Sequence, residues 1–319
     1  MNNMLTVSHA PHIKSADTTK SIMLDVLIAL MPALIAGVII MGYRASVLAL
    51  VCVAASVFFE WGWQKLLKKP TTIGDFSAAV TGLLIALNLP VTLPFWMAVV
   101  GCLFAIVVVK QFFGGLGHNF MNPALAARAF LLTSWAKPMT TWIKPFEKIS
   151  LFNNADVISS ATPLGVLKEG GELPGYASLF FGNIGGCIGE VSAFAILLGA
   201  AWLIYRRVID GKISAAFLLT LFVLSYAAGK DGLYQILSGG AMLGAFFMAT
   251  DYVTTPYTKK GEIIFGIGCG FLTFVIRNWG GYPEGVSYSI LLMNLLTPII
   301  DRLTVPKSFG EMGERKNAK

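Results

Sequence analysis

The sequence predicts an all-α integral membrane protein of about ten transmembrane helices, arranged as two inverted five-helix repeats around one long extracytoplasmic loop. Three observations lead to this prediction. Apolar residues make up 55% of the 319 residues and charged residues 13%, against roughly 25% charged in a soluble domain. Apolar runs of about 17 residues or more, long enough to cross a bilayer as helices, recur along the chain. Basic residues gather on alternate connections between these runs.

The apolar runs define the predicted spans and divide the chain into three parts. Residues 1–136 form an N-terminal tail and the first repeat, 137–188 form the long loop, and 189–319 form the second repeat and a C-terminal tail. In chain order the predicted spans are 22–42, 46–64, 77–92, 95–113, 121–136, 189–205, 213–229, 234–250, 262–278 and 286–301.

The positions of Lys and Arg predict which side each connection occupies, because cytoplasmic loops carry the excess of basic residues. With the N-terminus inside, only Arg44, Lys230 and Arg277 fall on short outer connections. Both termini are then cytoplasmic, and the long loop is extracytoplasmic. The residues counted as inside are Lys14, Lys20, Lys65, Lys68, Lys69, Lys110, Arg206, Arg207, Lys212, Lys259, Lys260, Arg302, Lys307, Arg315, Lys316 and Lys319.

The two sets of five spans begin on opposite faces, which is the arrangement of an inverted repeat. A sequence similarity supports this: "GLLIALNLPVTLP" (82–94) and "GAFFMATDYVTTP" (244–256) match in Gly, Val, Thr and Pro at one constant offset. A second similarity joins "GGLGHNFMNPALAARAF" (114–130) to "RNWGGYPEGVSYSILLMNLLTP" (277–298). Both are Gly/Asn/Pro-rich starts of a helix, which at membrane depth are tolerated where they line a cavity.

The long loop holds a polar stretch, "NNADVISSATPLGVLKEGGELPGY" (153–176). Its residues alone predict that Thr162 caps a short helix, since Pro163 suits the first helical position. The segment "DVISSAT" (156–162) resembles the flavinylation signature of Rnf and Na⁺-translocating NADH:quinone reductase subunits, where the last Thr carries FMN as a phosphoester. The resemblance implies Thr162 as the FMN acceptor, on an accessible loop, with Asp156, Ser159, Ser160 and Ala161 around it. Capping and attachment do not exclude each other.

The resemblance to the RnfD/NqrB family extends over most of the chain. "GHNFMNPALAARAF" (117–130), "IGGCIGEVSAFAILLGA" (184–200) and "MATDYVTTP" (248–256) look like family blocks in the expected order, and the short N-terminal tail is closer to RnfD than to NqrB. The family fold is similar to that of urea transporters. The resemblance implies a complex in the bacterial cell (inner) membrane that passes electrons between ferredoxin and NAD⁺ and moves Na⁺ or H⁺. It also implies partners of the A, B, C, E and G types and a flavin transferase for maturation.

This chain is expected to act only as one part of a larger complex, because it has no nucleotide fingerprint or cysteine cluster of its own. No nucleic-acid partner and no metal site are expected. Cys52, Cys102, Cys187 and Cys269 are isolated from one another in the sequence and are interpreted as small apolar packing residues.

The family also implies a second, non-covalent flavin, riboflavin, toward the cytoplasmic side. The candidate walls are Asn119, Asn122 and Pro123 in the first half and Thr250, Asp251, Thr254 and Thr255 in the second. Alternatively, Asn and Pro there simply end and restart helices. On the outer side, Arg277, Asn278, Tyr282 and Glu284 are candidates to lie near FMN, although Arg277 could equally extend to the membrane surface from a span end.

Charged residues near the spans admit several interpretations. Interfacial placement is the expectation for Asp25 and Glu190, whereas Glu60 fits an interfacial belt and an ion site equally well. Arg128 is expected to face a partner, a cavity or a carboxylate.

Two functions remain as alternatives to an RnfD-like protein: a solute channel of urea-transporter-like fold, and an NqrB-type member of Na⁺-translocating NADH:quinone reductase. The "SSAT" loop discriminates against the channel, which has no use for it.

Overall fold

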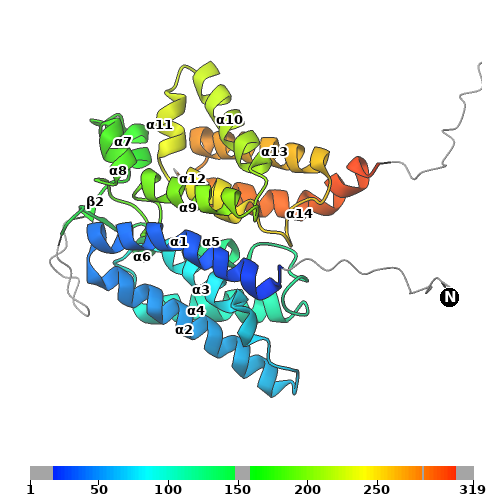
Figure 1. The fold of residues 1–319 in the computed structure, drawn as a ribbon. Coiled ribbons are helices and arrows are strands. Elements are labelled where there is room, and N and C mark those ends of the chain that lie inside the picture. The colour runs from blue at the N-terminus through cyan, green and yellow to red at the C-terminus, as the bar shows by residue number, and fades with distance from the viewer. Residues whose placement is uncertain (1–16, 148–158, 282–283, 307–319) are drawn as a thin grey trace, which may run out of the picture.

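The computed structural model describes residues 17–147, 159–281 and 284–306, and it is almost entirely helical (Figure 1). Helices occupy the places of all the predicted spans. The first half consists of α1 (Thr19–Met41), α2 (Tyr43–Leu66), a short 3₁₀ turn η1 (Ile73–Asp75), α3 (Ser77–Leu87), α4 (Phe95–Leu103) continuing as the π-helical η2 (Phe104–Gln111), and α5 (Pro123–Ser134). The second half consists of α9 (Ala193–Tyr205), α10 (Lys212–Ala227), α11 (Gly232–Leu237), α12 (Ala241–Leu243) continuing as the π-helical η3 (Gly244–Met248), α13 (Lys259–Trp279) and α14 (Val286–Thr304).

The connection between the halves has short elements of its own. These are α6 (Ala136–Met139), β1 (Trp142–Ile143), β2 (Ser159–Ser160), α7 (Pro163–Glu169) and α8 (Tyr176–Phe181). The hydroxyl of Tyr176 donates to the carboxylate of Asp231, which caps α11. This bond lowers the pKa of Asp231 and fastens α8 to the second half.

The helices differ in length more than the sequence predicts. Among the described helices, α1, α2 and α14 are long and apolar enough to cross a membrane. In contrast, α3 has 11 residues and α5 has 12. At a rise of about 1.5 Å per residue, neither alone covers a hydrocarbon core of roughly 30 Å.

The third predicted span is broken because proline ends it. The helix α3 stops at Leu87, and Pro90 and Pro94 keep residues 88–94 out of a helix. This segment is nevertheless buried inside the protein, with Leu89 and Leu93 fully covered.

Other parts of the chain satisfy the backbone groups that this break leaves. The guanidinium of Arg44 donates to the carbonyls of Thr92 at 3.3 Å and Leu93 at 3.2 Å, and the N–H of Ile188 donates to Leu89 O at 3.1 Å. Non-helical backbone is thus tolerated here because protein, not lipid, surrounds it. Arg44, expected on a short outer connection, is buried in this position.

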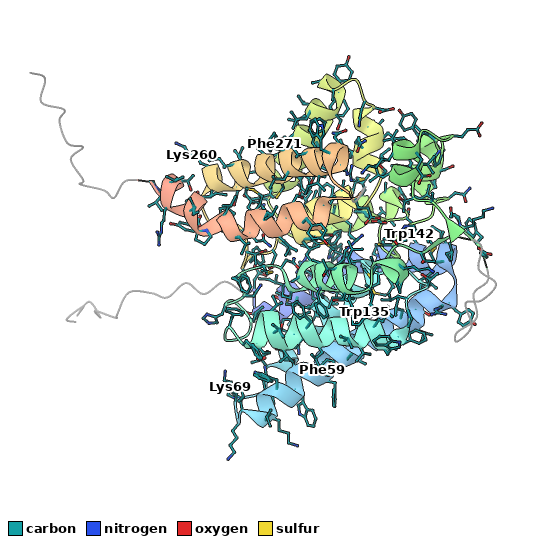
Figure 2. The ribbon with its side chains drawn as sticks, turned by 180° about the vertical axis from the view of Figure 1, so that it is seen from behind. Phe59, Lys69, Trp135, Trp142, Lys260 and Phe271 are labelled. Carbon is teal, nitrogen blue, oxygen red and sulfur yellow. The ribbon has the colours of Figure 1, made fainter. Side chains whose placement is uncertain are left out.

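The two halves lie side by side, the first in blue to cyan and the second in green to red (Figure 1). Within them α2 packs on α3 and α4, and α10 packs on α13, while α1 and α9 join the halves. The start of α1 and the end of α14 lie at one end of the molecule, and β2 and α7 lie at the other (Figure 1). Lys69 and Lys260 lie at the former end and Trp142 toward the latter (Figure 2).

Gly199 in α9 marks a close approach between the halves. A Cβ at this position would overlap the carbonyl oxygen of Ala29 and lie 2.9 Å from Phe247 Cζ. We expect Gly199→Ala to lower the free energy of unfolding by roughly 1–3 kcal/mol, because α1 and α9 must move apart. Thermal unfolding in detergent measures this. Gly62→Ala in α2 is the control, since apart from its chain neighbours and the backbone of its own helix nothing lies within 4 Å of its Cβ position. An equal loss in both variants would contradict the close contact.

Candidate functional site

A two-stranded ribbon brings the polar stretch of the long loop against the end of the first half. The strands β1 and β2 pair antiparallel, with Trp142 opposite Ser160. The chain then enters α7, whose first residue is Pro163. The Thr162 side chain accepts a hydrogen bond from the N–H of Gly165 at 3.1 Å, so the predicted helix cap is confirmed.

Thr162 lines a cavity of about 490 Å³, here called the outer cavity. Ligand sites typically measure roughly 300–1,000 Å³, so a small molecule of several rings fits this space. Thr162 is only 4% exposed, which differs from the expectation of an openly accessible loop hydroxyl. The cavity is lined by Arg128, Ala129, Leu132, Met139, Thr140, Thr141, Trp142, Ser160, Ala161, Thr162, Gly165, Glu284, Gly285, Ser287 and Tyr288.

The other predicted outer-side residues divide into two groups. Ser160, Ala161 and Glu284 line the outer cavity with Thr162. Ser159 lies beside them in β2. Asp156 and Tyr282 lie outside the described residues.

Arg277 and Asn278 are not among the residues that line this cavity. The Arg277 guanidinium donates to the carbonyls of Gln235 at 2.5 Å, Ser238 at 3.0 Å and Gly239 at 3.2 Å. Asn278 accepts a bond from Lys230 Nζ. Arg277 therefore stabilises the backbone at the break between α11 and α12.

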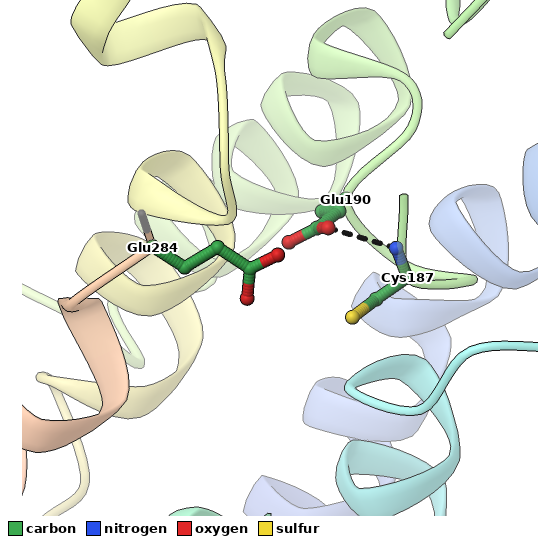
Figure 3. A group of neighbouring side chains, drawn as sticks. All are labelled: Cys187, Glu190 and Glu284. Carbon is green, nitrogen blue, oxygen red and sulfur yellow. Dashed lines mark hydrogen bonds between the residues drawn. The ribbon is translucent and has the colours of Figure 1, made fainter. Parts of the chain in front are cut away.

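A buried cluster of charged side chains borders the outer cavity. Arg128 donates to Asn88 Oδ1 at 3.0 Å and to the carboxylate of Glu284. The carboxylate of Glu190 accepts the N–H of Cys187 at 2.8 Å, and Glu190 and Glu284 point toward each other beside the Cys187 sulfur (Figure 3). One ligand atom from each of these three residues lies within 4.8 Å of the others.

Arginines neutralise this cluster. Arg277 Nε donates to the backbone oxygen of Glu284 at 3.2 Å, and Arg128 bonds its carboxylate. Burial raises the pKa of Glu284 to about 7, with Arg128 opposing and Glu190 reinforcing the shift. Two arginines thus face two carboxylates, an arrangement without the net negative charge that favours a cation. Cys187, expected in apolar packing, lies instead among charges; the other three cysteines are buried without such partners in the described residues.

A second cavity of about 100 Å³, the inner cavity, lies between the two halves. Asn119, Asn122 and Pro123 from the first half line it, and Thr250 and Asp251 from the second half face them. The side chain of Asn122 also donates to the carbonyl of Met248 at 3.3 Å, which ties the halves together.

Thr254 and Thr255 do not line the inner cavity but support Asp251 from behind. Thr254 Oγ1 donates to Asp251 Oδ2 at 3.2 Å, and Thr255 Oγ1 donates to the Asp251 carbonyl at 2.8 Å. The structure therefore brings together five of the predicted riboflavin residues and gives the remaining two a supporting position.

Lys110 is a lining residue of the inner cavity that the sequence did not predict. Its Nζ lies 2.9 Å from Glu60 Oε2 and 2.7 Å from Ser77 Oγ, and Gln111 also donates to Glu60 at 2.9 Å. Lys110 and Glu60 are 2% and 0% exposed. Lys110, counted on the cytoplasmic side, and Glu60, for which an interfacial belt and an ion site were both open, neutralise each other inside the protein. The available signal was a lysine inside a predicted span, 95–113.

Asp25 and Glu190, expected at the membrane interface, are also largely covered by the protein, at 8% and 6% exposure. Asp25 accepts bonds from Arg206 at 3.2 Å and from Trp202 at 3.3 Å. Arg128 meets the expectation for it twice, since it faces both a cavity and a carboxylate.

Comparison with known proteins identifies the family. The model of the family described as NQR2, RnfD, RnfE matches residues 6–310. This chain belongs to that family. The family is one of integral membrane proteins, so the predicted class is confirmed.

The relatives that match nearly the full length of this chain are D components of ion-translocating oxidoreductase complexes. The chain is 51% identical to the D component of the Na⁺-translocating ferredoxin:NAD⁺ oxidoreductase complex of Acetobacterium woodii, over 100% of both chains. It is 42% identical to the D component of the proton-translocating ferredoxin:NAD⁺ oxidoreductase complex of Clostridium ljungdahlii, over 97% of both. It is 40% identical to the D component of the ion-translocating oxidoreductase complex of Stutzerimonas stutzeri, over 92% of this chain and 93% of that one. None of these relatives is a solute channel.

Proposed function

We propose that this chain, as the RnfD-type component of an ion-translocating ferredoxin:NAD⁺ oxidoreductase, carries electrons through FMN joined to Thr162 and through riboflavin in the inner cavity. One observation carries the proposal. The last threonine of the "DVISSAT" segment lies in the wall of a cavity of about 490 Å³, in a chain whose full-length relatives belong to redox complexes.

The residues of the outer cavity fit a covalently held FMN. Thr162 offers a hydroxyl at the wall, and Leu132, Met139 and Trp142 offer apolar surface for a planar ring. The apolar side chains exclude water from the ring, and the tether on Thr162 keeps the cofactor at one place. Flavin supplies one-electron chemistry that side chains do not.

The residues of the inner cavity suit riboflavin chemically, but the cavity is small. The amides of Asn119 and Asn122 and the carboxylate of Asp251 provide the donors and acceptors that a flavin edge or a ribityl chain needs. A volume of about 100 Å³ is room for a few water molecules. Binding of a three-ring flavin therefore requires lining side chains to move apart.

The arrangement of the halves supports an inverted repeat of urea-transporter type. In each half the second span packs on the fourth, α2 on α4 and α10 on α13, and the third is broken. The start of α1, the end of α14, Lys69 and Lys260 share one end of the molecule, opposite α7 (Figures 1 and 2). By the positive-inside rule, that end and both termini are cytoplasmic, and the loop at 137–188 with Thr162 is extracytoplasmic.

The chain relies on partners for the rest of the proposed pathway. Subunits of the A, B, C, E and G types supply the other redox centres, and a flavin transferase attaches FMN. The transported ion is Na⁺ or H⁺; the relatives named above include one of each kind.

Measuring the covalently attached and the releasable flavin of the protein tests the proposal. We expect protein that is co-expressed with its flavin transferase to show a fluorescent band on a denaturing gel, because a phosphoester survives denaturation. We also expect the supernatant of the denatured protein to contain riboflavin, measured by chromatography. A chain without the fluorescent band would contradict covalent FMN, and mildly purified protein that releases no riboflavin would contradict the inner site.

A further inference from the structure

Arg128 is the sole cationic residue among the described residues that line the outer cavity. It projects from the middle of α5 and is only 7% exposed. A buried guanidinium costs free energy unless it is paired or bound. Arg128 meets this need with partners that hold it at the wall of the ligand-sized cavity that Thr162 also lines.

Two side chains hold the Arg128 guanidinium in place. Asn88, beyond the end of α3, accepts one N–H at 3.0 Å, and the Glu284 carboxylate, before α14, accepts another. Glu284 lines the cavity as well, so both charges of the pair face the same space. Arginine has five donors, and these two bonds leave others for a molecule in the cavity.

We propose that Arg128 contacts the redox-active ring of the cofactor in the outer cavity and that the Arg128–Glu284 pair sets the redox potential of that cofactor. The inference rests on the proposed attachment of FMN to Thr162. An added electron makes the ring more negative. A fixed cation in a water-poor site stabilises the negative charge of the reduced ring more strongly than a cation in bulk water does. A carboxylate beside that cation weakens this stabilisation.

The charge of Glu284 should make this effect depend on pH. The groups that face Glu284 are Arg128 from α5, Arg277 from α13, and Cys187 and Glu190 from the segment before α9. Burial places the pKa of Glu284 near 7, so its carboxylate is ionised above that pH and protonated below it. Removing the charge of Glu284 should therefore change the redox potential of the cofactor at alkaline pH and have little effect on it at acidic pH.

The experiment compares the potential of the covalent flavin in three proteins by spectroelectrochemical titration at pH 8.5 and pH 6. Glu284→Gln should raise the potential at pH 8.5, equivalent to roughly a tenfold gain in the equilibrium constant for reduction, and should shift it less at pH 6. Adding Arg128→Gln to Glu284→Gln should lower the potential again. The double variant avoids a buried, unpaired carboxylate, so it should fold.

Lys168→Gln is the matched control. Lys168 is an exposed cation of α7, on the same side of the molecule as Thr162, and solvent screens its charge. Its loss should leave the potential unchanged. Equal potentials in wild type and Glu284→Gln at both pH values, or in Glu284→Gln and the double variant, would overturn the inference. Absence of covalent flavin from the wild-type chain would instead overturn the proposed function.

Discussion

Thr162→Ala is expected to abolish the fluorescent flavin band completely, because alanine has no oxygen with which to form the phosphoester. The protein should still fold. Losing the cap on α7, where Thr162 accepts the Gly165 N–H at 3.1 Å, should cost about 1 kcal/mol. The measurement is in-gel fluorescence normalised to total protein, with riboflavin release measured on the same sample.

Two further substitutions, Ser160→Ala and Thr162→Ser, are the controls. Ser160→Ala removes a hydroxyl that also lines the outer cavity but leaves the acceptor in place, so the band should remain. Thr162→Ser keeps both the oxygen and the cap, so it should retain flavin where alanine does not. A band that persists in Thr162→Ala would move the attachment to another residue, and a band lost in Ser160→Ala would show that Thr162 is not the sole determinant.

Lys110→Met should destabilise the protein by about 3–5 kcal/mol, since it leaves Glu60 buried without its cation. Glu60 is completely covered, and its Oε2 lies 2.9 Å from Lys110 Nζ. Thermal or urea unfolding in detergent measures the loss. The double variant Glu60→Gln/Lys110→Met should be less destabilised than Lys110→Met alone, because no unpaired charge remains.

A lysine at the surface is the control for this prediction. Lys212 pairs with Asp210, but their side chains are 38% and 67% exposed. Lys212→Met should therefore change the free energy of unfolding by about 1 kcal/mol or less. If Lys110→Met were as mild as Lys212→Met, the buried pair would not be a source of stability.

The features that depend on residues adjacent in the sequence were predictable from the sequence. The cap at Thr162 followed from a threonine before Pro163, and the places of the helices followed from apolar runs. The length of α3 was overestimated because the apolar, buried residues Leu89 and Val91 continue past the helix end. Burial keeps those residues apolar whether or not they are helical, so hydropathy alone does not mark the break.

Charge pairing was the least predictable feature. Lys110 and Glu60 are 50 residues apart in the chain, and Arg128 and Glu284 are 156 apart. A count of basic residues on each side treats every charge separately, so it placed Lys110 on the cytoplasmic side without indicating its pairing with Glu60. For the same reason the sequence named Arg277 as a candidate to lie near FMN, whereas among the described residues the cation that lines the outer cavity is Arg128.

The burial of Thr162 has a consequence for the biogenesis of the protein. A hydroxyl that is 4% exposed and already bonded to Gly165 does not reach the active centre of another enzyme. If FMN is attached there, the transferase must act before the loop between the halves has docked, or must wait for it to open. Maturation would then have a fixed order, in which the cofactor is added first and the closing of the loop over it completes the protein.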